Sequence, residues 1–242
     1  MERLDKILAL HNVGSRKEAG ALVRAGAVTV NGRAAARPEQ KVDPEQDEIA
    51  VHGRPLTLRR HVYLMMNKPA GVLSAARDKN APTVVDLLPP QLRRRGLFPA
   101  GRLDKDTEGL LLLTDDGGLA HRMLSPKSHV YKLYEARLDR PAQPGDQAAF
   151  AAGLQAGELS CLPARLSWGE DPCLVQVEVR EGKFHQVKRM FHAVGKEVVA
   201  LRRLRIGGLS LDPALSPGQA RFLTGEEVEK IFLPQAVENP TA

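Results

Sequence analysis

Cysteine is scarce in this sequence. Only Cys161 and Cys173 occur among the 242 residues, and they stand neither close enough to each other nor near enough to histidines to form a metal-ligand pattern. Free thiols are the rule in a reducing cytoplasm. We therefore expect two free thiols, no metal site and a cytoplasmic location.

Long apolar stretches are also missing. Residues 1–6 are charged and lack the apolar core of a secretory signal, and no later segment approaches the roughly 18 uninterrupted apolar residues that a membrane span needs. We therefore expect a soluble protein. A hydrophobic content of 43% is ordinary for a globular chain with a real core, and 242 residues can hold one large domain or a small and a medium one.

Basic residues exceed acidic ones, which gives a net charge of +6 and a pI near 9.5. The surplus is concentrated between residues 180 and 206, where eight lysines and arginines accompany only two glutamates. Such a concentration is typical of a surface that binds phosphates. A solvated basic face without a ligand is the alternative that composition leaves open.

A polar loop leads directly into the most apolar run of the chain. Residues 101–109 precede four consecutive leucines, residues 110–113, which Asp115, Asp116 and Gly117 follow closely. A short apolar run with such bounds predicts a fully buried strand. In the loop, Arg102 and Asp104 flank Leu103, so we expect a carboxylate at the mouth of a cleft. A surface turn with an incidental ion pair is equally compatible with the local pattern.

The first 50 residues predict a compact unit of two helices and a small hairpin. Apolar spacing predicts a helix over 3–10, and Ser15 with Glu18 forms a capping-box pattern for a second helix from Arg16. A strand over 27–30 then runs into Asn31-Gly32, the favoured pair for a tight turn. We expect residues 53–60 to be a short, mobile connection to the rest of the chain.

The remaining pattern alternates strands and helices. Strands are expected at 61–66, 130–138, 173–179 and 198–206, and helices at 118–124 and 147–152. After residue 183 a turn and a helix should bury Phe184, Val187 and Phe191. Thr224 and Glu227 predict a capped last helix that ends near Phe232, and the final ten residues should be frayed.

The front unit, with Arg3-Leu4-Asp5-Lys6, Ser15-Arg16-Lys17-Glu18-Ala19 and Val28-Thr29-Val30-Asn31-Gly32, resembles the alpha-L RNA-binding module of ribosomal small-subunit protein four. The resemblance implies an RNA-binding module over residues 1–58, in which basic side chains of the two helices contact phosphates. Such contacts position RNA without reading its sequence. The residues implied are Arg3, Lys6, Arg16, Lys17 and Arg24.

The rest of the chain resembles the pseudouridine synthases. The motifs are Asn67-Lys68-Pro69-Ala70-Gly71, the Arg102-Leu103-Asp104 triplet, the Lys132-x-Tyr134 pair and the stretch 181–191. This resemblance implies a catalytic domain over 61–234, and an α+β fold with a mainly antiparallel mixed sheet flanked by helices. It further implies that Asp104 is the catalytic carboxylate, that Tyr134 lines the pocket beside it, and that Lys188 is the basic partner of Asp104. RNA contacts are expected for Arg102, His185, Gln186 and Arg189. For His185 and Gln186, a helix-cap or structural role is the equally compatible alternative.

The implied reaction isomerises uridine in RNA to pseudouridine and needs no metal or organic cofactor. The carboxylate either attacks C1′ of the ribose or assists loss of a ribose proton, on a nucleotide flipped out of its helix. The stretch 184–191 resembles that of enzymes acting on small-subunit ribosomal RNA, and the family default is a monomer. A large-subunit enzyme and a non-catalytic, RNA-binding assembly protein are the alternatives.

Overall fold

The computed structural model describes residues 1–44, 46–56, 58 and 61–233. The chain divides into two compact units, one formed by Met1–Val62 with Pro89–Leu97, the other by Tyr63–Leu88 with the chain from Phe98 onward. The expected frayed end lies outside the described residues, apart from its first residue, Leu233. No helix of the described chain has the length and apolar character needed to cross a membrane.

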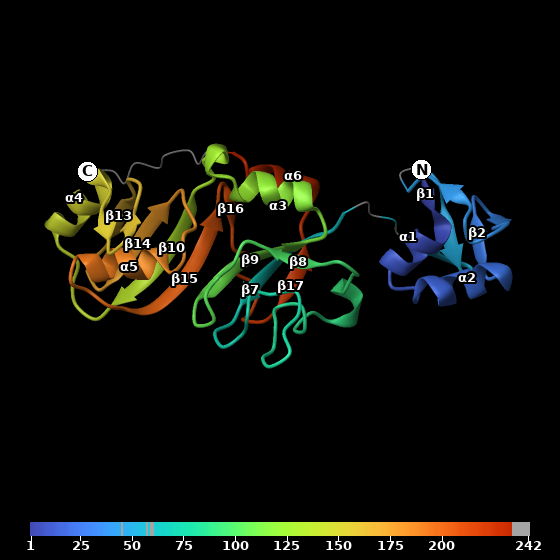
Figure 1. Ribbon diagram of the computed structural model, residues 1–242, viewed down its shortest axis with the longest axis horizontal. Coiled ribbons are helices and arrows are strands. Elements are labelled where there is room, and N and C mark those ends of the chain that lie inside the picture. Colours follow the sequence, from blue (N-terminus) through green and yellow to red (C-terminus); the bar gives the residue numbers. More distant parts are fainter. Residues whose placement is uncertain (45, 57, 59–60, 234–242) are drawn as a thin grey trace. The chain divides into compact units, whose positions relative to one another are not determined.

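The first unit packs two helices on short antiparallel strands (Figure 1). The Ser15 hydroxyl accepts from the Glu18 N–H, and the Glu18 carboxylate accepts from the Ser15 N–H, so the predicted capping box starts the second helix. Leu4, Leu8 and Val23 are buried in the shared core. The elements are β1 (Glu2–Arg3), α1 (Leu4–Leu10), α2 (Arg16–Arg24), β2 (Val28–Val30), β3 (Arg33–Ala34), β4 (Lys41–Val42), β5 (Ile49–Val51) and β6 (Arg54–Leu56).

The expected connection over residues 53–60 starts too early. Arg54–Leu56 forms β6, because it pairs with β5 as the second arm of a hairpin and completes a sheet of order β3-β2-β5-β6. Gly53, with φ +73, sits in the turn of that hairpin. Residues 57, 59 and 60 of the expected connection lie outside the described residues.

The second unit is built on one nine-stranded sheet with helices beside it, so the α+β expectation is confirmed. Its main path runs β13-β14-β10-β15-β9-β7-β17, with β16 paired to β15 and β8 to β9. The strands of this sheet are β7 (Tyr63–Lys68), β8 (Phe98–Ala100), β9 (Glu108–Thr114), β10 (Lys132–Leu138), β13 (Arg165–Trp168), β14 (Leu174–Val179), β15 (Val198–Ile206), β16 (Leu209–Ser210) and β17 (Ala220–Phe222). The helices are α3 (Gly117–Leu124), α4 (Pro144–Ala152), α5 (Gln186–Ala193) and α6 (Gly225–Lys230), and β11 (Gln155–Ala156) and β12 (Leu159–Ser160) form a separate hairpin.

A narrow junction joins two halves of this sheet. Strands β7, β8, β9 and β17 form one half, and β10, β13, β14 and β15 form most of the other (Figure 1). The junction consists of parallel pairing between β9 and β15 at Arg202 with Glu108 and Arg203 with Gly109. Gly109 has φ +98, and a Cβ placed there would lie 2.3 Å from the backbone oxygen of Arg203. Only glycine therefore permits this approach.

The predicted leucine strand is confirmed. Leu110, Leu111 and Leu113 of β9 are completely buried, and Leu112 is nearly so. Met65 of β7 and Met123 of α3 pack with Leu110 and Leu112 in one core cluster. Because both faces of β9 are covered, its start is a rigid base for the loop that precedes it.

Candidate active site

The loop before β9 is fastened by its apolar residue. Leu103 is buried, and its backbone makes two hydrogen bonds to the Ser74 hydroxyl, which accepts from the Leu103 N–H at 3.0 Å and donates to the Leu103 carbonyl at 2.8 Å. Arg102 is exposed, and the Asp104 side chain is 28% exposed. The buried leucine therefore directs its two charged neighbours toward solvent.

Lys68 fastens the same loop through hydrogen bonds to its backbone carbonyls. Its side chain is fully buried, and its ammonium group donates to four carbonyls, those of Pro69, Asp104, Lys105 and Thr107, at 2.8 to 3.2 Å. Burial lowers the pKa of Lys68 to about 8, while nearby carboxylates, Asp106 first, oppose that shift. Sequence reasoning placed Lys68 only in the motif over residues 67–71, without a role, and a lysine at the end of an apolar strand was the one signal that it holds the loop.

The Asp104 carboxylate faces the connection between β14 and α5. Its Oδ1 lies 3.5 Å from Nε2 of His185, and its Oδ2 lies 3.8 Å from Nζ of Lys188. Lys188 is closer to Asp106, whose two oxygens lie 2.6 and 2.7 Å from Nζ. The hydrogen bond from Lys188 lowers the pKa of Asp106. The expected basic partner of Asp104 is thus shared with a second carboxylate, which sequence reasoning missed.

Tyr134 lies across the site from Asp104 on β10. It is buried, and its hydroxyl accepts a hydrogen bond of 3.3 Å from Nη1 of Arg203, whose Nε donates to the Leu110 carbonyl. Lys132, two residues earlier on the same strand face, is also buried, and burial followed by the charge of Arg203 lowers its pKa to about 8. Lys132 and Arg203 are therefore two buried basic side chains in the same part of the sheet as Tyr134. Sequence reasoning did not assign either of them a role.

A narrow pocket joins these groups. It has a volume of about 60 Å³, and Asp104, Thr107 and Tyr134 contribute to its wall together with Arg102, His185 and Gln186. The loop before β9, strand β10 and the start of α5 each supply part of the wall. The structure thus brings together five sequence-predicted site residues: Asp104, Tyr134, Arg102, His185 and Gln186.

Two of the predicted RNA contacts are engaged within the protein. Gln186 is buried, its amide nitrogen donates to Glu181, and its amide oxygen accepts from the Lys183 N–H. Arg189 donates to the Ala156 carbonyl. We therefore assign Gln186 to positioning the connection between β14 and α5.

The burial expected for Phe184 is wrong, because the helix starts later than the pattern suggests. Helix α5 begins at Gln186 and buries Val187, Met190 and Phe191, whereas Phe184 precedes it and is 67% exposed. His185, the residue before the helix, has φ +51, which turns the chain out of the helical path.

The basic segment 180–206 is not one exposed surface. Lys196, Arg203 and Arg205 are buried. Lys196 pairs with Asp146 at 2.7 Å, and Arg205 pairs with Glu178 at 2.7 Å. Part of the charge surplus that suggested a phosphate-binding surface is therefore buried in the interior of the second unit.

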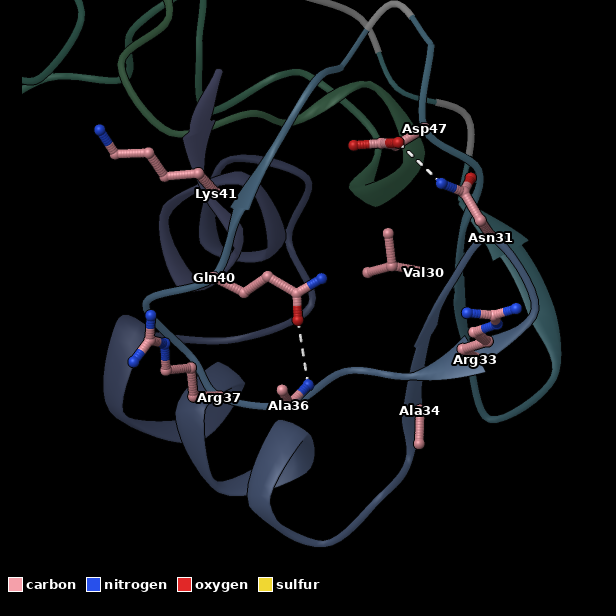
Figure 2. A pocket seen from close by; sticks show the side chains of 9 residues that line it. All are labelled: Val30, Asn31, Arg33, Ala34, Ala36, Arg37, Gln40, Lys41 and Asp47. Carbon is pink, nitrogen blue, oxygen red and sulfur yellow. Dashed lines mark hydrogen bonds between the residues drawn. The ribbon is translucent and has the colours of Figure 1, made fainter.

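Several predicted RNA contacts in the first unit also have acidic partners. Arg3 and Arg16 both bond to Asp5, whose pKa is lowered chiefly by the hydrogen bond from Arg3, and Lys6 pairs with Glu2. Lys17 and Arg24 are exposed on α2. The same unit holds an open hollow of about 850 Å³ beside β3 and β4, with Arg33, Arg37 and Lys41 around it (Figure 2). Sequence reasoning did not identify this hollow.

Within the described ranges, no three or more His, Cys, Asp or Glu side chains gather as a metal site would require. Cys161 and Cys173 are both free thiols, and burial raises the pKa of Cys161.

The chain matches two families in the order that the fold shows. Residues 2–49 match the S4 domain, and residues 62–193 match the RNA pseudouridylate synthases. An uncharacterized RNA pseudouridine synthase of Bacillus subtilis (strain 168) is 50% identical over 238 residues, covering 97% of this chain and 100% of the relative. A crystal structure of a pseudouridylate synthase aligns with a TM-score of 0.66 at 38% identity, covering 96% of this chain and 100% of that one.

The chain therefore belongs to the RNA pseudouridine synthases, enzymes that isomerise uridine in RNA, and it carries an S4 domain at its N-terminal end. Among its similar relatives is the ribosomal small subunit pseudouridine synthase A of Escherichia coli (strain K12). That protein is 42% identical over 232 residues, covering 95% of this chain and 99% of the relative.

Proposed function

We propose that this enzyme converts a uridine of small-subunit ribosomal RNA to pseudouridine, with Asp104 as the catalytic carboxylate. The observation that carries the proposal is the position of Asp104 on an anchored loop, in the wall of the same pocket as Tyr134. The choice of RNA is supported by the similarity, over 95% of the chain, to an enzyme named for the small ribosomal subunit.

The reaction breaks the bond between ribose C1′ and N1 of uracil, rotates the base, and joins C1′ to C5. The C5 proton is released and N1 gains a proton, so no oxidant or reductant is consumed. The Asp104 carboxylate can attack C1′ or assist loss of a ribose proton, and in either case it faces the positive charge that develops on the sugar. Tyr134 supplies a ring face that keeps the detached base in the pocket.

The basic groups near Asp104 fit these demands. The ammonium group of Lys188 and the imidazole of His185 lie within 4 Å of its carboxylate, where the Lys188 charge can offset its negative charge without a close bond to either oxygen. The closer bonds from Lys188 to Asp106 engage its ammonium group with that second carboxylate. Asp104 is therefore held in place and remains open to a ribose.

Access to the uridine requires flipping the nucleotide out of its RNA helix, at a cost of a few kcal/mol. Arg102 is exposed beside Asp104 and in the pocket wall, so we assign it to the RNA backbone or to the space that the flipped base leaves. We further propose that the enzyme acts as a monomer in the bacterial cytoplasm, where its substrate is made.

The test is tritium release from RNA labelled at uracil C5. We expect release from small-subunit ribosomal RNA, naked or in assembling particles, and at least a 1,000-fold lower rate for Asp104→Asn, on the scale of a lost essential group. Release from large-subunit RNA alone would contradict the choice of substrate. Release by Asp104→Asn at the wild-type rate would contradict the role of Asp104.

A further inference from the structure

Phe184 presents an open aromatic face next to the pocket. Its ring lies on the imidazole of His185, with ring centroids 3.8 Å apart and an interplanar angle of 19°. His185 Nε2 in turn lies 3.5 Å from Asp104. One ring face covers the imidazole, and Phe184 as a whole residue is still 67% exposed, which leaves the other face for a ligand. An exposed stacking surface therefore stands one side chain away from the proposed catalytic carboxylate.

The exposure of this ring is fixed by its backbone. The chain from Glu181 to Gln186 is tied by the hydrogen bonds of Gln186 to Glu181 and to the Lys183 N–H, and His185 adopts a left-handed conformation. The buried side of α5 is already occupied by Val187, Met190 and Phe191. Exposing a phenyl ring forgoes the free energy of burying it, so a ligand that covers the ring regains that free energy.

A nucleobase is the ligand that fits this position. Proteins that recognise unpaired RNA stack its bases on aromatic side chains. When the target uridine leaves the RNA helix, a base next to it loses a stacking partner. We propose that Phe184 stacks on the base adjacent to the target uridine and thereby holds the RNA while the uridine occupies the pocket. This inference rests on the proposed function.

The kinetic test compares Phe184→Ala and Phe184→Trp with the wild type on small-subunit ribosomal RNA. Loss of one stacked base predicts a KM about 5- to 100-fold higher for Phe184→Ala with little change in kcat, and Phe184→Trp should restore KM. Val199→Ala is the matched control, because Val199 is 68% exposed and truncating it removes exposed apolar surface elsewhere on the domain. A KM for Phe184→Ala equal to that of the wild type would overturn the proposal.

A second measurement separates stacking from other effects. Once the modified uridine is mapped, the wild type should bind an RNA that lacks the adjacent base more weakly than the complete RNA, whereas Phe184→Ala should bind both RNAs equally. Additive losses of binding free energy from the substitution and from the missing base would overturn the proposal. Quenching of tryptophan fluorescence by RNA should be stronger for Phe184→Trp than for the wild type, whose single tryptophan is Trp168. This comparison needs no turnover, so it tests stacking even if tritium release shows that the proposed function fails.

A separate observation concerns the hollow of the S4 domain. Arg33, Arg37 and Lys41 are exposed around it, and none of them has a salt bridge to another described residue. Asp47 is the one carboxylate in the wall of this hollow, and it is engaged by the Asn31 amide and the Asp43 N–H. Gln40 accepts from the Ala36 N–H, which leaves its amide nitrogen to donate into the hollow (Figure 2).

These features fit a sugar–phosphate backbone. A concave site lined by positive charges focuses its electric field on a negative ligand. No aromatic ring that could stack a base is among the residues that line the hollow. Arg3 of β1 and Arg16 of α2 are paired to the buried Asp5, so they are less available to phosphates. We infer that the hollow is the main RNA-backbone site of the S4 domain and binds phosphates regardless of sequence, an inference that also rests on the proposed function.

The test measures RNA affinity against salt concentration for two triple variants of the full chain. The hollow variant combines Arg33→Gln, Arg37→Gln and Lys41→Gln, and it should reduce the magnitude of the negative slope of log K against log salt by about two to three. The helix variant combines Lys6→Gln, Lys17→Gln and Arg24→Gln. It removes the same charge from the helices and should reduce the magnitude of the slope by less. The probe is a small-subunit ribosomal RNA transcript, and the measurement does not depend on turnover.

Three outcomes would overturn this second proposal. The first is an unchanged slope for the hollow variant, and the second is a larger fall for the helix variant. The third is normal binding of the hollow variant to naked RNA with weakened binding to assembling particles, because a protein surface would then occupy the hollow.

Discussion

A buried ammonium group with only carbonyl partners is unusual, and Lys68 has four of them. Replacement by methionine keeps much of the side-chain volume but removes the donor that the four carbonyls share, whereas those of Asp104 and Lys105 keep a backbone donor, the N–H groups of Thr107 and Gly71. We expect Lys68→Met to lower the free energy of unfolding by about 3 kcal/mol, the scale of unsatisfied buried groups. Because two of the carbonyls belong to Asp104 and Lys105, kcat should fall more than KM rises.

Urea unfolding and steady-state kinetics of Lys68→Met test this expectation together. The matched control is Lys105→Met, which removes an exposed lysine of the same loop and should unfold like the wild type. Wild-type stability of Lys68→Met would show that the loop is held by other contacts.

The function of Tyr134 can be divided between its ring and its hydroxyl. If the ring holds the uracil base, Tyr134→Phe should retain kcat within about fivefold, whereas Tyr134→Ala should lose at least 100-fold, as expected when a positioning surface is removed. Loss of the hydroxyl also removes the acceptor for Arg203, which costs about 1 kcal/mol of stability. A loss of activity in Tyr134→Phe as large as in Tyr134→Ala would assign the chemistry to the hydroxyl.

At the scale of elements, the start of α6 contains a pH-sensitive contact. Glu227 completes the capping box with Thr224, and its carboxylate also bonds both terminal nitrogens of Arg221 on β17. The hydrogen bonds from Arg221 are the main cause that lowers the pKa of Glu227 to about 2, against 4.5 in the unfolded chain. The unfolded chain therefore binds the proton first as pH falls.

Glu227 thus contributes stability that is complete above about pH 4.5 and is lost as the pH falls toward 2. We expect Glu227→Gln to lower the free energy of unfolding by about 2 kcal/mol at pH 7 and by little near pH 2. Urea unfolding at a series of pH values measures the difference. A difference between the two proteins that stays constant from pH 7 to pH 2 would contradict the assigned contact.

Local sequence signals predicted many of the elements. The four leucines identified β9 because a run that is apolar at every position needs cover on both sides, and Ser15 with Glu18 identified the start of α2 because the cap involves neighbouring backbone. Phe184 was assigned to the wrong environment because the left-handed backbone of His185 left no sequence signal. Asp104 and Tyr134 were predicted from their motifs, whereas the contacts of Lys68, Asp106 and Arg203 join distant segments that a local pattern does not bring together.

At the scale of the whole molecule, the two halves of the sheet each carry one part of the proposed active site. The loop with Asp104 leads into β9, and Tyr134 lies on β10, which pairs with β15. Their separation is therefore set where β9 meets β15, at Gly109. A backbone contact at Gly109 thus sets the geometry of the proposed site.

We expect Gly109→Ala to lower the free energy of unfolding by 3 kcal/mol or more, since strain of the backbone and the clash with Arg203 act together. Gly117→Ala is the control, because a Cβ at that first residue of α3 meets nothing within 4 Å. It should be neutral or slightly stabilising. Equal unfolding midpoints for the two variants would show that the junction can widen without cost.

The same glycine bears on how activity screens of this enzyme should be interpreted. In a library that replaces every residue in turn and selects for pseudouridine in RNA, substitutions at Gly109 should be rejected as uniformly as those at Asp104. Loss of activity alone would place a backbone contact and a reacting carboxylate in the same class. A parallel measurement of the amount of folded protein in the cell would separate them, because changes at Asp104 should leave that amount intact and changes at Gly109 should not.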